Sequence, residues 1–195
     1  KMTLGGDTTG TNAGSYNATF TPGANYKWND GTTDIKTVPW TIGKAAGSLT
    51  LGKSSMTLNA SKMSDTITVT RIGNGTISAV SSSDSVATVQ VSGDTITVTA
   101  KAKGNAIITV SVAADANYAA PANKTCSVTV TLPTSTLEDN DWAMISQVSN
   151  SGKGSSYWAV GDTKTITING EVGNFTFSNL SIAVFIIGFN HNSRW

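Results

Sequence analysis

Side chains that could perform chemistry are few in this chain of 195 residues, which contains one histidine, one cysteine and two glutamates. His191 lies between two asparagines, a setting that suits a metal ligand or a general base. No second histidine exists, and no carboxylate lies closer to it in sequence than Glu171. A chemical role would need partners from distant segments. We therefore expect a structural or surface histidine, no catalytic residue and no enzyme activity.

The acidic cluster Glu138-Asp139-Asn140-Asp141 is the one place where several oxygen ligands follow one another. Ca²⁺ prefers carboxylate and carbonyl oxygens, so Asp139 and Asp141 are the candidate metal ligands. The cluster lacks the glycine and the distal glutamate of an EF-hand loop. Capping of a helix by Asp139 or Asn140 within a solvated linker is the favoured interpretation. We expect no cofactor, with calcium as the alternative.

Aromatic residues form the third candidate site, because most of them come in neighbouring groups. Aromatic rings can stack on sugars while adjacent amide and carboxylate groups donate or accept hydrogen bonds. Trp28 is expected at a hairpin tip beside an asparagine and an aspartate. The competing and favoured interpretation is burial in a core or contact between modules. The candidate carbohydrate-binding residues are Tyr26, Trp28, Tyr157 and Trp158.

Cys126 alternates with Val128 and Val130 along the chain. Successive side chains of a strand point to opposite faces, so these three residues share one face. We therefore expect Cys126 to face the core as a small apolar residue, and not to act as a nucleophile.

Low charge excludes several classes of protein. Only 13% of the residues are charged and the formal net charge is +1, whereas an average soluble domain carries roughly 25% charged residues. A nucleic-acid-binding protein needs a dense basic patch, which 13 scattered cations do not form. No window contains the roughly 18 apolar residues that a membrane span requires. We expect neither nucleic-acid binding nor membrane insertion.

The elements that must position these residues are predicted to be β-strands, because polar and apolar residues alternate. The hexapeptide at Asp65–Thr70 recurs at Asp94–Thr99, and each copy places threonine on the outward face. Turn sequences such as Asn169-Gly170 punctuate the strands. The one helix candidate spans 137–148. The predicted strands of the middle region are 48–52, 56–59, 65–71, 76–80, 86–91, 94–101, 105–113 and 124–132, of which the first two could form one kinked strand.

Changes in composition divide the chain into three parts, 1–43, 44–132 and 133–195, with short linkers expected at 42–47 and 132–136. The middle part has the short, evenly spaced strands of a sandwich. The first part contains two predicted strands, Gly14–Thr21 and Thr33–Ile42, and a lone hairpin is marginal in water. The fold class is therefore all-β, a β-sandwich with β-rich flanking segments and almost no helix beyond one short helix near 138–148.

The middle part resembles the group 2 bacterial immunoglobulin-like domains. A serine-rich turn followed by Val86-Ala87-Thr88-Val89 carries the resemblance, together with the run from Asp94 to Val110, and it covers residues 44–132. The resemblance implies an immunoglobulin-like sandwich on an extracellular protein, at a bacterial cell surface or on a phage virion.

The flanking parts are similar to other pieces of such proteins. Residues 1–43 look like the closing hairpin of another immunoglobulin-like repeat, carried by Asn12–Phe20 and Val38–Ile42. Residues 133–195 resemble the start of a β-rich C-terminal module found in bacterial surface and prophage proteins. Trp142, Tyr157–Lys164 and Gly188–Asn192 carry that likeness. Both flanks are thus expected to be partial.

Three hypotheses of function remain. The leading one is a non-enzymatic structural or adhesion module that spaces or presents other domains, with other structural proteins or copies of itself as partners. The second is a carbohydrate-binding module that uses exposed aromatic residues on cell-surface glycans. The third is a fragment of an enzyme whose catalytic part lies outside this chain.

Overall fold

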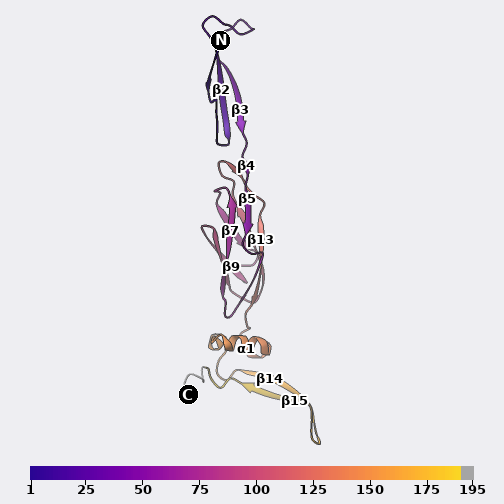
Figure 1. Ribbon diagram of the computed structural model, residues 1–195. Helices are drawn as coiled ribbons and strands as arrows, with labels where there is room; N and C mark the ends of the chain where they lie inside the picture. Colours follow the sequence, from indigo (N-terminus) through magenta and orange to yellow (C-terminus); the bar gives the residue numbers. More distant parts are fainter. Residues whose placement is uncertain (190–195) are drawn as a thin grey trace.

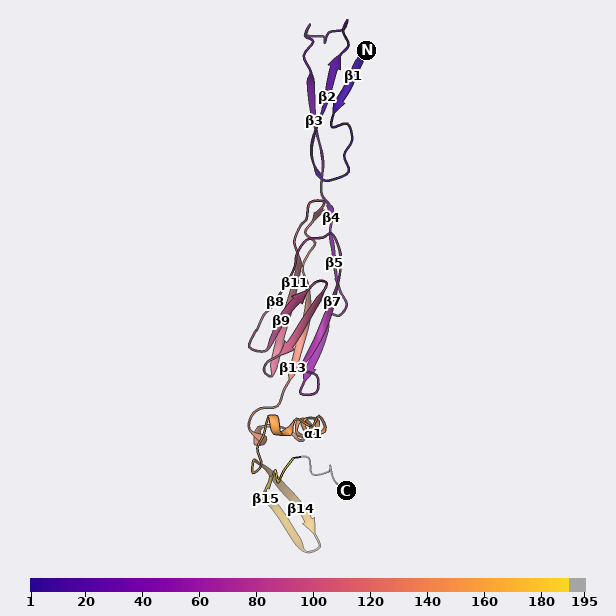
Figure 2. The same ribbon diagram turned by 90° about the vertical axis from the view of Figure 1, so that its left-hand side faces the viewer.

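The computed structural model describes residues 1–189 and shows an elongated rod (Figure 1). A three-stranded sheet forms one end, a two-layer sandwich the middle, and a helix with a two-stranded hairpin the other end (Figure 2). The helix, α1 (Trp142–Asn150), is too short to cross a membrane, and so is every other helix among residues 1–189.

Strands dominate, as predicted. Their bounds are β1 (Met2–Gly6), β2 (Gly14–Pro22), β3 (Lys36–Ile42), β4 (Ala45–Ala46), β5 (Ser48–Leu51), β6 (Ser55–Asn59), β7 (Ser64–Ile72), β8 (Ile77–Ser81), β9 (Ala87–Ser92), β10 (Thr95–Ala100), β11 (Gly104–Val112), β12 (Tyr118–Ala119), β13 (Lys124–Thr131), β14 (Thr163–Val172) and β15 (Phe175–Phe185). Two short 3₁₀ helices, η1 (Leu137–Asp139) and η2 (Gly154–Ser156), flank α1.

The sandwich consists of two four-stranded sheets, ordered β5-β7-β10-β9 and β6-β13-β11-β8. The first segment of the sandwich, which contains β5 and β6, passes from one sheet to the other. Strand β5 pairs antiparallel with β7, whereas β6 pairs parallel with β13. The connection from β8 to β9 also passes from one sheet to the other. This order is that of the immunoglobulin fold, in which two antiparallel sheets are joined by Greek-key connections. The predicted all-β, immunoglobulin-like fold class is confirmed.

The core of the sandwich is formed by apolar residues that alternate with polar residues along the strands. The apolar residues of the repeated hexapeptide, such as Ile67 and Ile96, are fully buried, and the threonines between them face outward. Cys126, Val128 and Val130 likewise lie inside, where Cys126 was expected. Burial raises the pKa of the Cys126 thiol, so the thiolate is disfavoured and the residue is inert as a nucleophile.

Of the two alternatives for residues 48–59, one kinked strand or two separate strands, the structure shows two. They are β5 and β6, and each belongs to a different sheet. Gly52 lies between them, and a Cβ atom at this position would come within 3.0 Å of the Thr68 hydroxyl oxygen. The missing side chain therefore lets the chain cross close to β7 as it changes sheets.

The N-terminal sheet has the order β1-β2-β3. Its first strand, Met2–Gly6, was missed by the sequence analysis, because its Gly-Gly end is atypical of strands. Tyr16 and Trp40 stack with ring centroids 4.5 Å apart, and the Trp40 indole donates to the Asp7 carbonyl. The loop between β1 and β2 thus lies over this aromatic pair and anchors the sheet.

Helix α1 begins later than the sequence predicted. Asp141 is its N-cap, with Oδ1 accepting the Met144 amide at 2.7 Å. The expected cap, Asp139 or Asn140, is therefore wrong, because Asp139 belongs to η1 and the Asn140 side chain is used elsewhere. Of the three residues at helical spacing, Val148 is buried and Ile145 packs on the core, while Trp142 is exposed.

Candidate functional site

The junction between the N-terminal sheet and the sandwich is a hydrogen-bonded structure, although the sequence suggested a short linker at 42–47. Strand β4 of this segment pairs in parallel with β12. Asn117 connects the two parts directly: its Oδ1 accepts the Ala13 amide at 2.8 Å, and its Nδ2 donates to Asn12 Oδ1 at 2.9 Å. Its carbonyl also accepts the Ala45 amide at 2.8 Å. The side chain of Asn117 therefore contacts the loop between β1 and β2, while its backbone holds the connecting strand β4.

Asp115 fixes the loop that presents Asn117. Its carboxylate accepts the backbone amides of Asn74, Asn117 and Tyr118. These hydrogen bonds, the one from Asn74 foremost, hold the pKa of the Asp115 carboxyl below its usual value. The side chain of Lys44 donates to the Asp115 carbonyl. The loop that carries Asn117 is thus held by hydrogen bonds in addition to those with the N-terminal sheet.

A second junction joins the sandwich to the C-terminal part, and Asn140 organises it. Asn140 is 5% exposed. Its Oδ1 accepts the Thr134 amide at 3.0 Å, and its Nδ2 donates to the Thr136 carbonyl at 2.7 Å. Its Nδ2 also contacts Thr134 Oγ1 at 2.8 Å. The polar segment after β13 is therefore folded around one buried amide. The sequence indicates only a capping role for Asn140.

Aromatic residues seal the same junction. Trp158 is 5% exposed, and its indole donates to the Thr134 carbonyl at 3.1 Å. Tyr157 packs on the core, with its hydroxyl 3.9 Å from Met63 Sδ in the sandwich. Val148 of α1 joins the same continuous core. The helix is thus attached to the sandwich by packing as well as by the chain.

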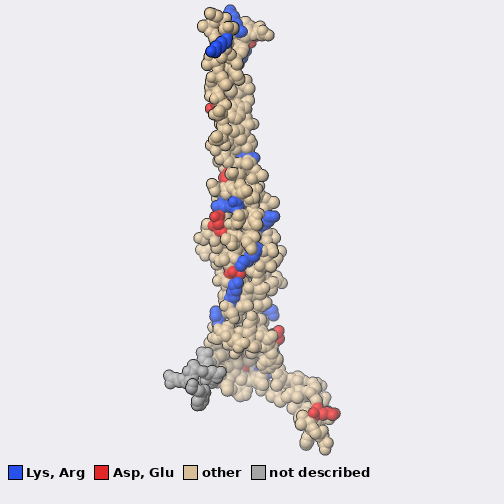
Figure 3. Space-filling model, viewed as in Figure 1, with Lys and Arg blue, Asp and Glu red and all other residues tan. Residues whose placement is uncertain are grey.

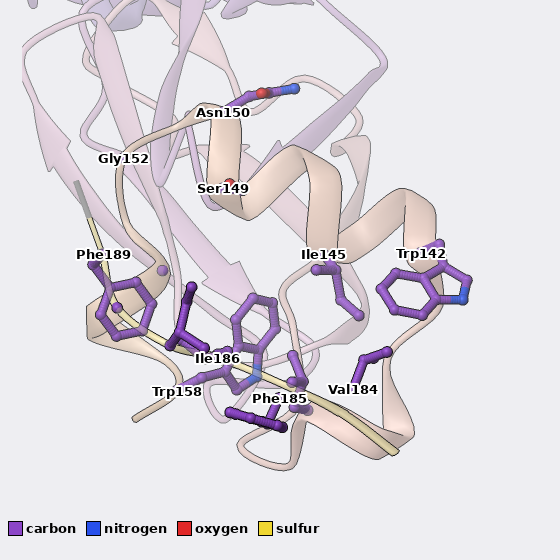
Figure 4. Close-up of a pocket in the computed structure, with 14 residues that line it drawn as sticks. Trp142, Ile145, Ser149, Asn150, Gly152, Trp158, Val184, Phe185, Ile186 and Phe189 are labelled. Carbon is purple, nitrogen blue, oxygen red and sulfur yellow. The ribbon is translucent and has the colours of Figure 1, made fainter. Parts of the chain in front are cut away.

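An apolar groove of about 910 Å³ runs between α1 and the end of β15 (Figure 4). Trp142 and Ile145 line it from the helix, and Val184 and Phe185 from the strand. Trp158 closes its base, and Glu138 fixes the hairpin by accepting the Thr165 amide. The lining offers no cluster of titratable groups for chemistry.

Tyr26 and Trp28 lie on the loop between β2 and β3, at the free end of the rod. The loop is ordered: Asp30 accepts both the amide and the hydroxyl of Thr32 and pairs with Lys36 at 2.7 Å. These contacts, the one with Lys36 foremost, hold the Asp30 pKa well below its ordinary value. Tyr26 is 59% exposed, whereas Trp28 is half-buried and its indole donates to the Asp34 carbonyl.

The structure does not bring the four candidate aromatic residues together. Tyr26 and Trp28 lie at one end of the rod, and Tyr157 and Trp158 at the other. The prediction that Trp158 is an exposed carbohydrate-binding residue is wrong, because its ring is buried in the second junction. Of the four candidates, only Tyr26 exposes most of its ring to solvent, and Trp28 lies on the same loop.

The candidate metal ligands have local structural surroundings. Asp141 caps α1, while Asp139 closes η1, where its amide donates to the Thr136 carbonyl. No group of three or more histidine, cysteine or acidic side chains forms a metal site within residues 1–189. His191, the other candidate for chemistry, lies outside the described residues.

Charge is sparse over the face shown in Figure 3, most of which carries neither acidic nor basic groups. Ion pairs in the described part of the chain are local, such as Lys53 and Lys62 with Asp65 at 2.8 Å each. Basic groups gather at the free end of the N-terminal sheet, and an acidic group lies at the free end of the hairpin (Figure 3).

No family model matches this chain, and no curated protein matches it. Solved structures that it resembles include domains 4 and 5 of the S-layer protein SbsC, with 21% identity, a TM-score of 0.36 and coverage of 61% of this chain and 58% of that chain. Domains 1–6 of SbsC match with 17% identity and a TM-score of 0.37, over 89% of this chain and 25% of that one.

The fibronectin(III)-like modules of Clostridium thermocellum CbhA match with 20% identity and a TM-score of 0.31, over 62% of this chain and 64% of that chain. In each case the match spans less than two thirds of the solved chain. The immunoglobulin-like assignment therefore rests on the strand order of the sandwich itself.

Proposed function

We propose that this chain is a non-enzymatic structural module that acts as a rigid spacer and presents other parts of its protein at a surface. The observation that supports this most directly is the junction at Asn117, where the connection between sheet and sandwich is hydrogen-bonded at both backbone and side chain. A flexible linker would leave these groups to water. A spacer needs these groups to be hydrogen-bonded within the protein, because it must hold its two ends at a fixed distance.

The proposal extends to the setting of the module. We infer an extracellular location, at a bacterial cell surface or on a phage virion, with the sandwich as a group 2 bacterial immunoglobulin-like domain over 44–132 and partial modules at 1–43 and 133–195. The nearly neutral, threonine-rich surface favours this setting, because it provides little long-range steering toward a charged partner.

Asn117→Ala tests the spacer. The change removes the side-chain bonds to Asn12 and Ala13 but keeps the backbone bond to Ala45. We expect small-angle X-ray scattering to show a rod of constant length for the native chain and a shorter, more variable one for the variant. Asn105→Ala is the matched control, because Asn105 is an exposed asparagine of the sandwich. Equal scattering from both variants would contradict the proposal.

The second candidate function is carbohydrate binding at the loop between β2 and β3, which we call the distal loop. The observation that favours it is the exposed Tyr26 on a hydrogen-bonded loop at the end of the rod, which also carries Asn29 and Asp30. Such a loop combines a stacking surface with hydrogen-bonding groups. Calcium binding by Asp139 and Asp141 is a separate proposal, because both residues lie at the other end of the rod.

A glycan array tests the second candidate. We expect Tyr26→Ala and Trp28→Ala each to lose binding, because both changes remove ring surface from the loop. Trp142→Ala is the aromatic control at the other end of the rod, because this ring is 52% exposed, and it is expected to retain binding. Trp158→Ala is unsuitable, since it would disrupt the second junction. Absence of binding by the native chain, or equal loss in the control, would refute carbohydrate recognition here.

A further inference from the structure

The acidic group at the tip of the distal loop is already paired within the loop. Asp30 Oδ1 accepts both the amide and the hydroxyl of Thr32, at 2.9 and 2.6 Å, and its Oδ2 pairs with Lys36 Nζ at 2.7 Å. The positive charge of Lys36 therefore offsets the negative charge of Asp30 at short range. A ligand at this loop meets the pair as a nearly neutral group.

Two lysines at the same end of the rod are free of such pairing. Lys1 and Lys27 are exposed, and neither forms an ion pair within residues 1–189. Lys27 follows Tyr26 directly in the chain. Lys1 lies next to the start of the loop, because its carbonyl accepts the Gly23 amide at 2.7 Å. A Cβ atom at Gly23 would come within 2.6 Å of that carbonyl oxygen and 3.5 Å of Tyr26 Cδ2, so the Tyr26 ring also borders Gly23.

One free carboxylate opposes these two cations. Asp34 is exposed and has no ion pair in the described part of the chain, while its carbonyl accepts the Trp28 indole at 2.7 Å. Two unpaired lysines against one unpaired aspartate leave an excess of one positive charge, where Figure 3 shows basic groups gathered. Exposed charges act over roughly 8–10 Å at physiological salt. The excess therefore acts on a ligand that already contacts the Tyr26 ring.

We propose that the distal loop selects anionic glycans, with a sugar stacked on the Tyr26 ring and its acidic groups bound by Lys27 and Lys1. A lysine ammonium is a compact charge with three rotatable donors, so it accepts carboxylate, sulfate and phosphate groups alike. A neutral glycan gains only the ring contact, whereas an anionic glycan also gains ion pairs. This inference rests on the proposed carbohydrate binding and names the class of glycan.

Matched pairs of polysaccharides test this preference with the full chain. Dextran sulfate and dextran share one backbone and differ in charge, and so do polygalacturonate and its methyl ester. We expect biolayer interferometry to show at least about fivefold tighter binding to each charged polymer than to its neutral partner, the change that one exposed ion pair provides in water. Added salt should reduce this difference.

Single variants assign the preference to the loop. Lys27→Gln should weaken binding to dextran sulfate about fivefold, whereas Lys27→Arg keeps the charge and should bind like the native chain. Asp34→Asn should strengthen binding, because it removes the opposing carboxylate. Lys124→Gln is the matched control, since Lys124 is an exposed lysine of β13 in the sandwich, and it should leave binding unchanged.

Three results would overturn the inference. Equal binding of charged and neutral polymers, lost in Tyr26→Ala, would remove the selectivity and leave carbohydrate binding intact. Equal weakening by Lys27→Gln and Lys124→Gln would show attraction to any exposed lysine. If neither charged polymer binds, the inference fails, and the glycan array shows separately whether the loop binds neutral sugars. None of these results affects the rigidity of the rod, so failure here and failure of the spacer function remain distinguishable.

Discussion

Asn140 illustrates how much of the structure depends on a single side chain. It is the one buried polar side chain among residues 1–189, and every polar atom of its amide is hydrogen-bonded. A buried amide that loses its partners is costly, so this site is tolerated only as a complete network. The sequence showed an asparagine in an acidic cluster and suggested a cap. Nothing local indicated that Thr134, six residues earlier, would fold back onto it.

Asn140→Ala should lower the free energy of unfolding by about 1–3 kcal/mol, because the Thr134 amide and the Thr136 carbonyl lose buried partners. Urea denaturation followed by tryptophan fluorescence measures this, since the Trp158 indole, one of five in the chain, lies in the same junction. Asn105→Ala, on an exposed strand position, should change stability by less than about 0.5 kcal/mol. Equal stability of the two variants would show that the junction does not depend on the amide.

At the scale of elements, periodicity predicted the sandwich and missed its connections. Alternation located every main strand of the middle part, because burial of one face specifies register. The segment 42–47 carries no such pattern, so the sequence predicts only a linker there. Its two-residue strand β4 forms only because β12 lies alongside, and contacts between distant segments are invisible to local periodicity. The same limit hid the separation of the candidate aromatic residues.

Gly47→Ala tests the role of this connection. A Cβ atom at Gly47 would lie 2.3 Å from the Ala119 carbonyl oxygen, so β12 must shift away from the connecting segment. We expect a loss of about 1–3 kcal/mol, typical of overpacking. Gly43→Ala is the matched control in the same segment, because nothing lies within 4 Å of its would-be Cβ. If thermal unfolding shows the same midpoint for both variants, the β4–β12 contact contributes little.

The whole molecule is a nearly neutral rod, and its ionisable groups predict a simple dependence on pH. Asp30, Asp65 and Asp115 are each bound by lysines or backbone amides, and these contacts hold their pKa below the ordinary value of 3.8. A carboxyl with a depressed folded pKa contributes stability above its unfolded pKa and loses it as the pH falls further. The single histidine leaves little else to titrate near neutrality.

We therefore expect the melting temperature to stay constant between about pH 5 and 8 and to fall progressively below about pH 4. Differential scanning calorimetry across this range checks the prediction. Asp115→Asn should flatten part of the acid decline, because the amide carries no charge to lose. A melting temperature that rises on acidification would contradict the assignment of these carboxylates as stabilising acceptors.

Rigidity of the rod is the central claim, and a distance distribution across the first junction tests it most directly. Spin labels at Thr37→Cys and Gln90→Cys lie on exposed positions of the N-terminal sheet and the sandwich, and native Cys126 is fully buried and resists labelling. Pulsed electron paramagnetic resonance should give one narrow distance peak, which broadens in the Asn117→Ala background. A broad distribution in the otherwise native chain would contradict the spacer account.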